Sequence, residues 1–286
     1  MMEIIEEMQI RLMREADIDF ALQMTSTEGW SSTRLDFEEL LQFDPEGCFV
    51  AEVDEIPIGM VCSCPYDGFG FVSNLIVDRE YRYKQYGTIL MKHIIEYLEK
   101  RGVMTQLLDG VIKAISLYER LGFVKKYRSM RLEGTVKPEE SDIVRPMTSE
   151  DLEVINRLDT EFFGAPREKF LHSRYSHFPN LAKVMEVRGK IVGYIMGSES
   201  RDAIRIGPWV IRDRLDLAEH LLTEFATEVE EKNLKIGVVE NNVKALGLLR
   251  KHGFNEVGHS WRMLRGIEGN WTLSDHLYAI CCAARG

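Results

Sequence analysis

The sequence lacks the features of several large protein classes. Among its 286 residues, no apolar run reaches the roughly 18 residues that a membrane-spanning helix needs. The first residues, "MMEIIEEM", are acidic where a secretory signal peptide is basic, so we expect a cytoplasmic protein with no membrane partner. Positive charge is also in deficit. The formal net charge is −10, which argues against a nucleic-acid partner bound through phosphate contacts.

Cysteine and histidine are few and scattered. The five cysteines include the neighbours Cys281 and Cys282, which are poorly placed for a disulfide, and Cys62 and Cys64, which would share one face of a strand. We therefore expect reduced thiols. The seven histidines show no Cys/His spacing typical of a metal site, so we expect no metal.

One supersecondary pattern occurs twice in the chain. "IRLMREADID" is similar to the later "IVRPMTSEDLE", and "IPIGMV" with Gly59 matches "KIVGYI" with Gly193. Near the end of each copy, "YERLGF" matches "LRKHGF". A repeat of this length predicts two similar domains that follow each other along the chain.

Each copy combines strands and helices. Two alternating apolar runs flank Asp54–Glu55, which indicates a hairpin, and a third run follows. After Gly87, apolar residues at i, i+1, i+4, i+5 and i+8 predict a helix with one buried face, formed by Leu90, Met91, Ile94, Ile95 and Leu98. This order predicts an α+β fold with a mixed sheet. We expect a first domain at 8–134, a linker at 135–140 and a second domain at 141–286.

The turn "VDREYRYKQYGTIL" (77–90) is unusually basic for an acidic protein. Arg79, Arg82 and Lys84 precede the predicted helix. A helix N-terminus carries unpaired N–H groups and a partial positive charge, so it favours phosphate. Cations spread over six residues fit a pyrophosphate better than a single phosphate.

The same residues carry a resemblance to a known family. The stretch resembles the acyl-CoA signature of GNAT-superfamily acetyltransferases, through Val77, Tyr81, Arg82, Gly87 and Leu90. "AISLYERLGF" is similar to the second signature of that superfamily, through Ala114, Leu117, Tyr118, Gly122 and Phe123. "EGWSS", "DPEG" and "LDGV" further resemble a prokaryotic group of this superfamily whose members carry two GNAT domains in tandem. The resemblance implies two GNAT-like domains, each a mostly antiparallel twisted sheet flanked by helices, with a catalytic first domain and a degenerate second one.

The resemblance also implies a set of residues that bind acetyl-CoA. The pantetheine arm would pair with the strand at Asn74, Leu75, Ile76 and Val77, and the pyrophosphate would lie on Arg82, Tyr83, Lys84, Gln85, Tyr86, Gly87 and Thr88. The family has glycine where this chain has Tyr83 and Gln85. Glycine there lets the backbone approach the pyrophosphate without obstruction by a side chain. We expect that Gln85 can still offer its N–H if its φ stays negative.

The implied chemistry is direct attack of an amine on the thioester in a ternary complex. Tyr118 would contact the coenzyme and protonate the departing thiolate, because a phenol near pKa 10 is a suitable donor. Glu28 and Asp109 are alternative bases for the amine, and a water chain is a third option. Glu28 and Trp30 are candidates for binding the amine, Trp30 through its ring face.

The second copy departs from the signature. Alignment of the two "GF" ends places Asp213 opposite Arg82, Asp216 opposite Gln85 and Ala218 opposite Gly87. Carboxylates there would repel a pyrophosphate. The first hypothesis is therefore an N-acetyltransferase, monomer or homodimer, that acts on a small amine or amino-acid-like acceptor. The alternative is a non-catalytic acyl-CoA-binding or sensor protein.

Overall fold

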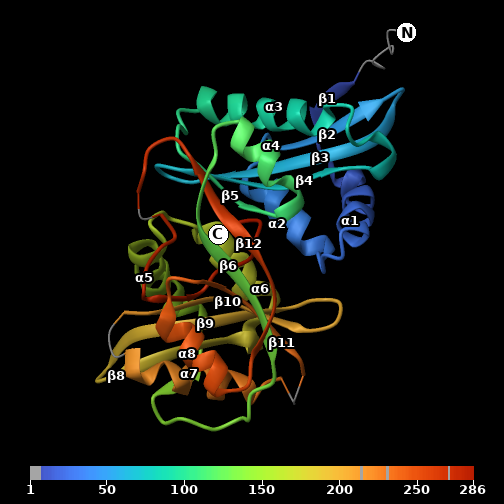
Figure 1. Cartoon of the computed structure of the whole chain (residues 1–286). Coiled ribbons are helices and arrows are strands. Elements are labelled where there is room, and N and C mark those ends of the chain that lie inside the picture. Colours follow the sequence, from blue (N-terminus) through green and yellow to red (C-terminus); the bar gives the residue numbers. More distant parts are fainter. Residues whose placement is uncertain (1–7, 213–214, 230–231, 270) are drawn as a thin grey trace.

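The computed structural model describes residues 8–212, 215–229, 232–269 and 271–286. Two halves are stacked, and the C-terminal end of the chain lies between them (Figure 1). Within the described ranges, no helix is long and apolar enough to cross a membrane.

The first half has strands and helices in the predicted order. Its strands are β1 (Gln9–Leu12), β2 (Cys48–Val53), β3 (Ile56–Pro65), β4 (Gly70–Val77), β5 (Gln106–Gly110) and β6 (Val124–Gly134). Its helices are α1 (Ile18–Thr27), α2 (Arg34–Phe43), α3 (Tyr86–Lys100) and α4 (Ile115–Arg120). The predicted hairpin at Asp54–Glu55 is confirmed, and both residues have positive φ, +50° and +64°.

The second half repeats this order and adds one strand. Its strands are β7 (Val144–Pro146), β8 (Ala182–Val187), β9 (Lys190–Glu199), β10 (Ile204–Ile211), β11 (Leu234–Val239), β12 (Asn255–Arg265) and the additional β13 (Leu277–Ala279). Its helices are α5 (Leu152–Phe163), α6 (Glu168–His177), α7 (Ala218–Ala226) and α8 (Val243–Lys251). The fold class is therefore α+β, as predicted.

The two halves exchange one strand each, β6 and β12. The described strands form one sheet in the order β1-β2-β3-β4-β5-β12-β6-β11-β10-β9-β8-β7, with β13 paired to β10. The late strand β12 lies between β5 and β6, and β6 lies between β12 and β11. Both strands cross the middle of the molecule in Figure 1. The domain limits 8–134 and 141–286 stay a prediction, because each half needs a strand of the other to complete its sheet.

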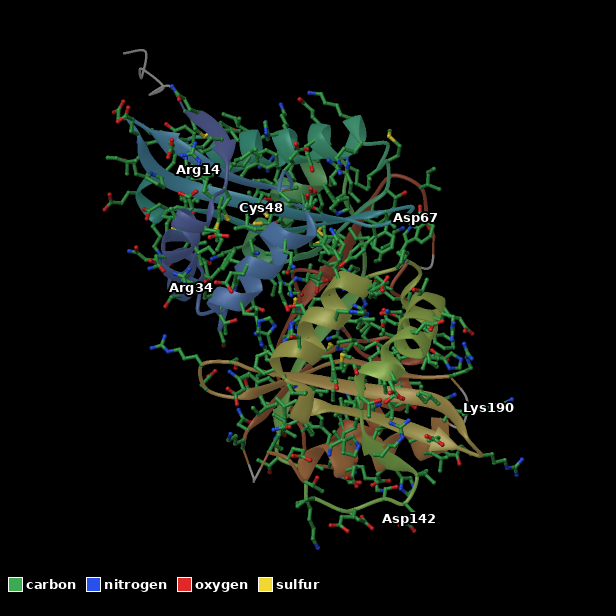
Figure 2. All side chains as sticks on the ribbon, turned by 180° about the vertical axis from the view of Figure 1, so that it is seen from behind. Arg14, Arg34, Cys48, Asp67, Asp142 and Lys190 are labelled. Carbon is green, nitrogen blue, oxygen red and sulfur yellow. The ribbon has the colours of Figure 1, made fainter. Side chains whose placement is uncertain are left out.

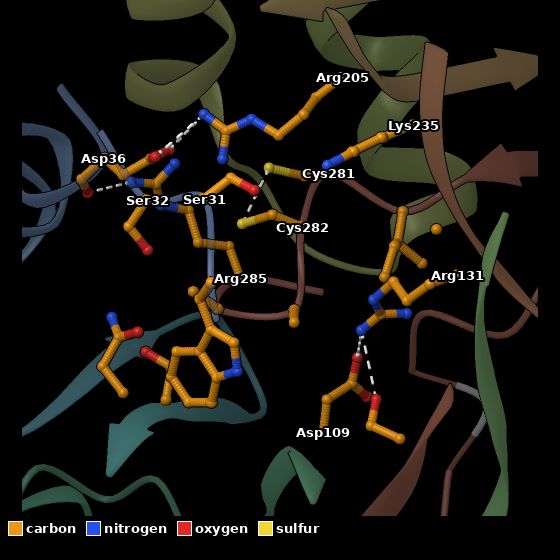
Figure 3. A pocket seen from close by; sticks show the side chains of 18 of the residues that line it. Ser31, Ser32, Asp36, Asp109, Arg131, Arg205, Lys235, Cys281, Cys282 and Arg285 are labelled. Atoms are coloured by element: carbon orange, nitrogen blue, oxygen red, sulfur yellow. Dashed lines mark hydrogen bonds and ion pairs between the residues drawn. The ribbon is translucent and has the colours of Figure 1, made fainter. Parts of the chain in front are cut away.

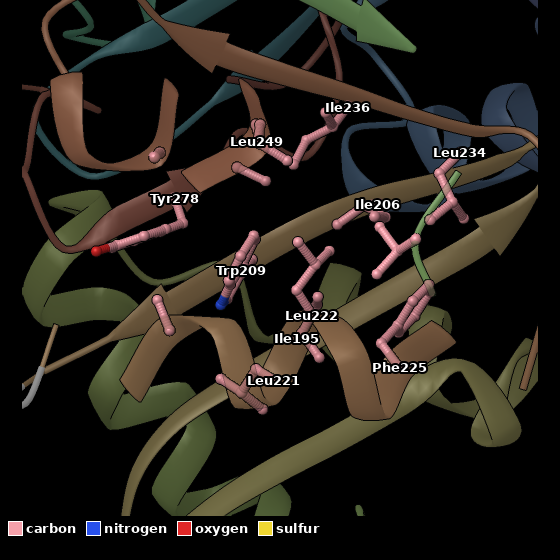
Figure 4. Packing of buried hydrophobic residues seen from close by; sticks show 14 of the residues in the cluster. Ile195, Ile206, Trp209, Leu221, Leu222, Phe225, Leu234, Ile236, Leu249 and Tyr278 are labelled. Atoms are coloured by element: carbon pink, nitrogen blue, oxygen red, sulfur yellow. The ribbon is translucent and has the colours of Figure 1, made fainter. Parts of the chain in front are cut away.

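Helices cover both faces of each half-sheet. The predicted stripe on α3 is confirmed by burial: Leu90, Met91, Ile94, Ile95 and Leu98 pack on strands of the first half. In the second half, Leu221, Leu222 and Phe225 of α7 pack against Ile206 and Trp209 of β10 (Figure 4). Full burial of such side chains contributes about 1.5–3 kcal/mol each.

The internal repeat corresponds to equal contacts in the two halves. Arg11 binds Asp17 at 2.7 Å, and Arg145 binds Asp151 at 2.7 Å. A Cβ on Gly59 would lie 2.9 Å from the carbonyl oxygen of Ile76, and one on Gly193 would lie 3.0 Å from that of Val210. Both glycines are therefore needed because two strands approach closely.

The cysteines are free thiols. Cys62 and Cys64 lie fully buried on β3 in the apolar cluster below α1 and α2, and Cys48, also buried, faces Cys62 across the strand pair. Figure 2 shows Cys48 inside the first half. These three side chains pack as small apolar groups.

Candidate functional site

Strands β4 and β5 separate to leave an open slot. They pair in parallel only at Gly70–Gln106, Phe71–Leu107 and Val72–Leu108. Beyond Val72, the β5-facing edge of β4 has no strand partner among the described residues. On its other edge, β4 has a bulge between Ser73 and Ile76, where Asn74 has φ +50°. Backbone N–H and C=O groups at the slot are therefore available to an extended ligand.

The loop before α3 presents free N–H groups. Helix α3 begins at Tyr86, and its N-cap, Gln85, makes no side-chain capping bond. In the described part of the chain, no acceptor takes the N–H groups of residues 83–88. Tyr83 and Gln85 have φ of +66° and +67°, and the Tyr83 side chain points into solvent, 101% exposed.

The condition on Gln85 is therefore not met, because its φ is positive. The loop keeps the left-handed backbone that favours glycine, at a cost of about 1–2 kcal/mol for each side-chain-bearing residue. This backbone shape aims consecutive N–H groups into one concavity, as an anion needs. Lys84 stays nearby, over the ring of Tyr81 at 5.3 Å.

Arg82 is held by a carboxylate. Its Nη2 donates to Oε1 of Glu28 at 2.5 Å, and its Nε donates to the carbonyl of Val77 at 2.8 Å. Lys113 binds the other oxygen of Glu28. Burial alone would raise the pKa of Glu28, but the hydrogen bonds from Lys113 and Arg82 outweigh it and lower that pKa. In this arrangement Glu28 fixes Arg82 and is a poor proton acceptor.

A cavity of about 560 Å³ connects the slot to the second half. Asn74, Leu75 and Tyr118 line it from the first half, together with Trp30. In the described structure Glu28 is not one of its lining residues. The cavity continues between the halves to polar residues of β10, β11 and the C-terminal segment (Figure 3).

Tyr118 lies at the wall of this cavity beside the slot. It comes from α4 and is 7% exposed. Burial raises the pKa of its hydroxyl, so the group stays protonated at neutral pH. No described residue forms a hydrogen bond with this hydroxyl, which leaves it free to donate into the cavity.

Asp109 also lines the cavity but is fully engaged. Arg262 of β12 donates to it at 2.6 Å and Arg131 of β6 at 3.0 Å, as the dashed line from Arg131 shows in Figure 3. Burial alone would raise the pKa of Asp109, but the charges of Arg262 and Arg131 outweigh it and lower that pKa. The carboxylate therefore joins the halves and is a weak base.

The equivalent slot of the second half is filled by the chain itself. Strands β10 and β11 also pair in parallel at three positions and then separate. There β13 pairs with β10, Trp209 with Ala279 and Val210 with Leu277. The N–H of Ile280 donates to the carbonyl of Gly237 on β11 at 2.9 Å. The predicted contrast at Asp213 lies outside the described residues.

Several ionisable residues of the cavity were not found from the sequence. They are Arg131, Arg205, Lys235, Cys282 and Arg285. The thiol of Cys281 lies 3.7 Å from that of Cys282. A hydrogen bond from Cys281, with the charge of Arg285, lowers the pKa of Cys282 to about 6. No local pattern marks these residues, because strand pairing and the folded C-terminal segment bring them together.

Known proteins share this architecture. A model described as "Acetyltransferase (GNAT) family" matches residues 15–123, and one described as "Acetyltransferase (GNAT) domain" matches residues 155–279. The holothin acyltransferase of Pseudoalteromonas sp. (strain SANK 73390) is 25% identical over 244 residues, 84% of this chain and 82% of that protein. A putative acetyltransferase from Pyrococcus horikoshii superposes with a TM-score of 0.81 at 25% identity, covering 98% of this chain and 96% of that chain.

A more distant structure shows the tandem fold alone. It is a tandem GNAT protein from the clavulanic acid biosynthesis pathway, with a TM-score of 0.61 at 13% identity, covering 92% of this chain and 99% of that chain. The fold, the slot and the two matched regions together define an acyltransferase. The chain belongs to the GNAT acetyltransferase superfamily and carries two GNAT domains in tandem.

Proposed function

We propose that the first half transfers an acetyl group from acetyl-CoA to the amine of a small acceptor bound in the interdomain cavity. One observation carries this proposal. The open slot between β4 and β5 leads into the cavity of about 560 Å³ between the halves, and the loop that follows β4 in the same half presents the uncapped N–H groups of residues 83–88. The slot suits an extended pantetheine arm, and the loop suits a pyrophosphate.

Acetyl-CoA supplies the activated acetyl group when it is bound. The residues of this chain position the two substrates and stabilise the charge that develops during the reaction. The bulge leaves Asn74 and Leu75 without a register partner on β3, so the N–H of Leu75 is suited to stabilise negative charge on the thioester oxygen. Holding amine and thioester together contributes several kcal/mol more, up to about 7–11 in well-oriented systems. The hydroxyl of Tyr118 donates a proton toward the sulfur.

The acceptor amine must lose a proton without a free carboxylate base. Glu28 and Asp109 are both paired with two cations, so the water chain is the proton acceptor that this geometry favours. The amine enters beside Trp30, whose ring face attracts a cation. We therefore assign Glu28 and Asp109 positioning roles and keep Tyr118 as the catalytic residue.

Because Glu28 and Asp109 are both paired with cations, an alternative is a non-catalytic acyl-CoA-binding or sensor protein. Replacement of Tyr118 separates the two hypotheses. Under the enzyme hypothesis, Tyr118→Phe lowers kcat by about 10²–10⁴-fold and leaves the calorimetric Kd for acetyl-CoA nearly unchanged. Tyr127→Phe, a buried tyrosine in the small apolar cluster with Val239 and Ile280, is the matched control. Wild-type protein that binds acetyl-CoA but acetylates nothing in a broad amine panel would establish the alternative.

A further inference from the structure

Two cations stand side by side on the sheet of the second half. The three parallel pairs of β10 and β11 are Ile204–Leu234, Arg205–Lys235 and Ile206–Ile236. The middle pair places Arg205 and Lys235 on the same face of the sheet. In the first half the corresponding middle pair is Phe71–Leu107, and both of these residues are buried in an apolar cluster.

A pair of cations in place of an apolar pair is expected to destabilise the fold. Like charges directly opposite each other on neighbouring strands repel, and burial of charged groups removes them from water. The rest of the second half-sheet keeps its apolar packing, since Ile206 and Ile236 are buried in the core with α7. The two cations are therefore a local departure from the repeat, and they need an explanation at this place.

Both cations face the cavity of the proposed active site. Figure 3 shows Arg205 and Lys235 on one side of it and Asp109, at the end of β5, on the other. Cys282, whose thiol has a lowered pKa, and Arg285 also line this cavity. An acceptor with its amine at the β4–β5 slot would extend its far end toward Arg205 and Lys235.

Arg205 keeps hydrogen-bonding capacity. Its Nη2 donates to the two oxygens of Asp36 at 3.1 and 2.9 Å. Its Nε is buried and has no partner among the described residues, and no hydrogen bond of the described structure involves its Nη1. Lys235 binds Asp202 at 2.8 Å and Glu133 at 3.4 Å. A guanidinium with uncommitted donors beside an ammonium is a suitable partner for a carboxylate.

We infer that Arg205 and Lys235 bind a carboxylate of the acyl acceptor, so that the acceptor is an amino-acid-like amine with its acidic group at the far end. This inference rests on the proposed function. The net charge of −10 repels anions over long distances, so an acidic acceptor needs cations built into the cavity. The degenerate second half thereby supplies specificity while the first half supplies the chemistry.

Ion pairing between the halves is the simpler explanation, because Asp36 of α2 and Arg205 of β10 join them. That explanation predicts changes in stability and no change in which acceptor is preferred. The experiment therefore measures discrimination between acceptors. It uses the full chain with acetyl-CoA and two amines of equal length, 5-aminopentanoate and 1,5-diaminopentane, which differ in one terminal group, with three- to six-carbon pairs to set the span.

For wild-type protein we expect kcat/KM to favour the amino acid over the diamine by at least about tenfold, which is 1.4 kcal/mol. Lys235→Glu reverses this preference, mainly through KM, and Arg205→Lys retains part of it. Lys190→Glu makes the same charge change at an exposed position of the second half and leaves the ratio unchanged. Equal use of both amines by wild type, or a ratio insensitive to Lys235→Glu, would overturn the inference.

Two further measurements separate the possible failures. Calorimetry with acetyl-CoA alone tests the proposed function, and the Lys235→Glu variant should bind acetyl-CoA as wild type does. Stabilisation by 5-aminopentanoate, followed by thermal unfolding, tests the anion site without turnover and should be lost in Lys235→Glu. A preference for 4-aminobutyl phosphate that depends on Lys235 would overturn the carboxylate assignment in favour of a phosphate.

Discussion

The two halves of this chain contain the same slot, and only the first is open. In each half, three residue pairs join the two parallel strands before the slot. A bulge follows in β4 and in β10, and a helix begins after the strand. The first slot leads into the cavity, whereas β13 occupies the second. In the second half a strand of the chain itself pairs with β10, at the position that we propose for the pantetheine arm in the first half. The second half then provides one wall of the cavity in which we propose that the acceptor binds.

The largest effect is expected from emptying the second slot. Deletion of residues 277–286 removes the buried Leu277, Tyr278 and Ile280, a loss of the order of 5–9 kcal/mol that is comparable with the whole stability of a domain. We expect insoluble or unfolded protein. Leu277→Ala alone should cost about 2–5 kcal/mol in denaturant unfolding. A truncated chain that stays folded and binds two equivalents of acetyl-CoA would contradict the role of β13 as a structural occupant.

Local patterns made part of this comparison predictable. The repeat, the stripe on α3 and Tyr118 at the slot all depend on residues close in sequence, where periodicity and spacing are informative. Strand β13 has only three residues and pairs with β10 far upstream. Glu28 meets Arg82 and Lys113, which lie 54 and 85 positions away. The sequence around Glu28 suggests a general base, but ion pairs with these distant cations make the carboxylate a weak proton acceptor.

The loop before α3 gives the next largest effect, because it distinguishes the two halves by charge. Gln85→Asp introduces the residue type that the second half has at Asp216. A carboxylate beside a pyrophosphate should weaken acetyl-CoA binding by about 10–100-fold, or 1.4–2.8 kcal/mol. Gln85→Gly is the matched control: with φ at +67°, glycine fits without strain, and affinity should be kept or improved. Equal calorimetric Kd values for the two variants would argue against a pyrophosphate on this loop.

The variant Glu28→Gln distinguishes a positioning role of Glu28 from a role as general base. If Glu28 positions Arg82, the variant should raise the Kd for acetyl-CoA by about 3–10-fold and leave the shape of the pH–rate profile unchanged. As a base, it would lose kcat with its pH dependence and keep the Kd. Because the pKa of Glu28 is lowered in the folded state, its ion pairs stabilise the fold above a pH of about 4.3 and are lost as pH falls further. The difference in unfolding free energy between wild type and variant should shrink over that acidic range.

The smallest difference between the halves is expected at the ion pairs that both retain, because these pairs are structural. Asp17 accepts two hydrogen bonds from Arg11 and one from the N–H of Arg14, and Asp151 accepts the same set from Arg145 and Thr148. These bonds lower the pKa of both carboxyls, with the arginine bond the largest cause.

Asp17→Asn and Asp151→Asn should therefore each cost about 1–2 kcal/mol at neutral pH, measured by denaturant unfolding. A lowered folded-state pKa means that this stabilisation is complete above the unfolded pKa near 3.9 and disappears as pH falls through the folded value. Neither variant should change acetyl-CoA affinity, since neither residue touches the slot. A cost confined to one half would show that the repeated contact serves different purposes in the two copies, and the structural equivalence on which the comparison of the slots rests would then fail.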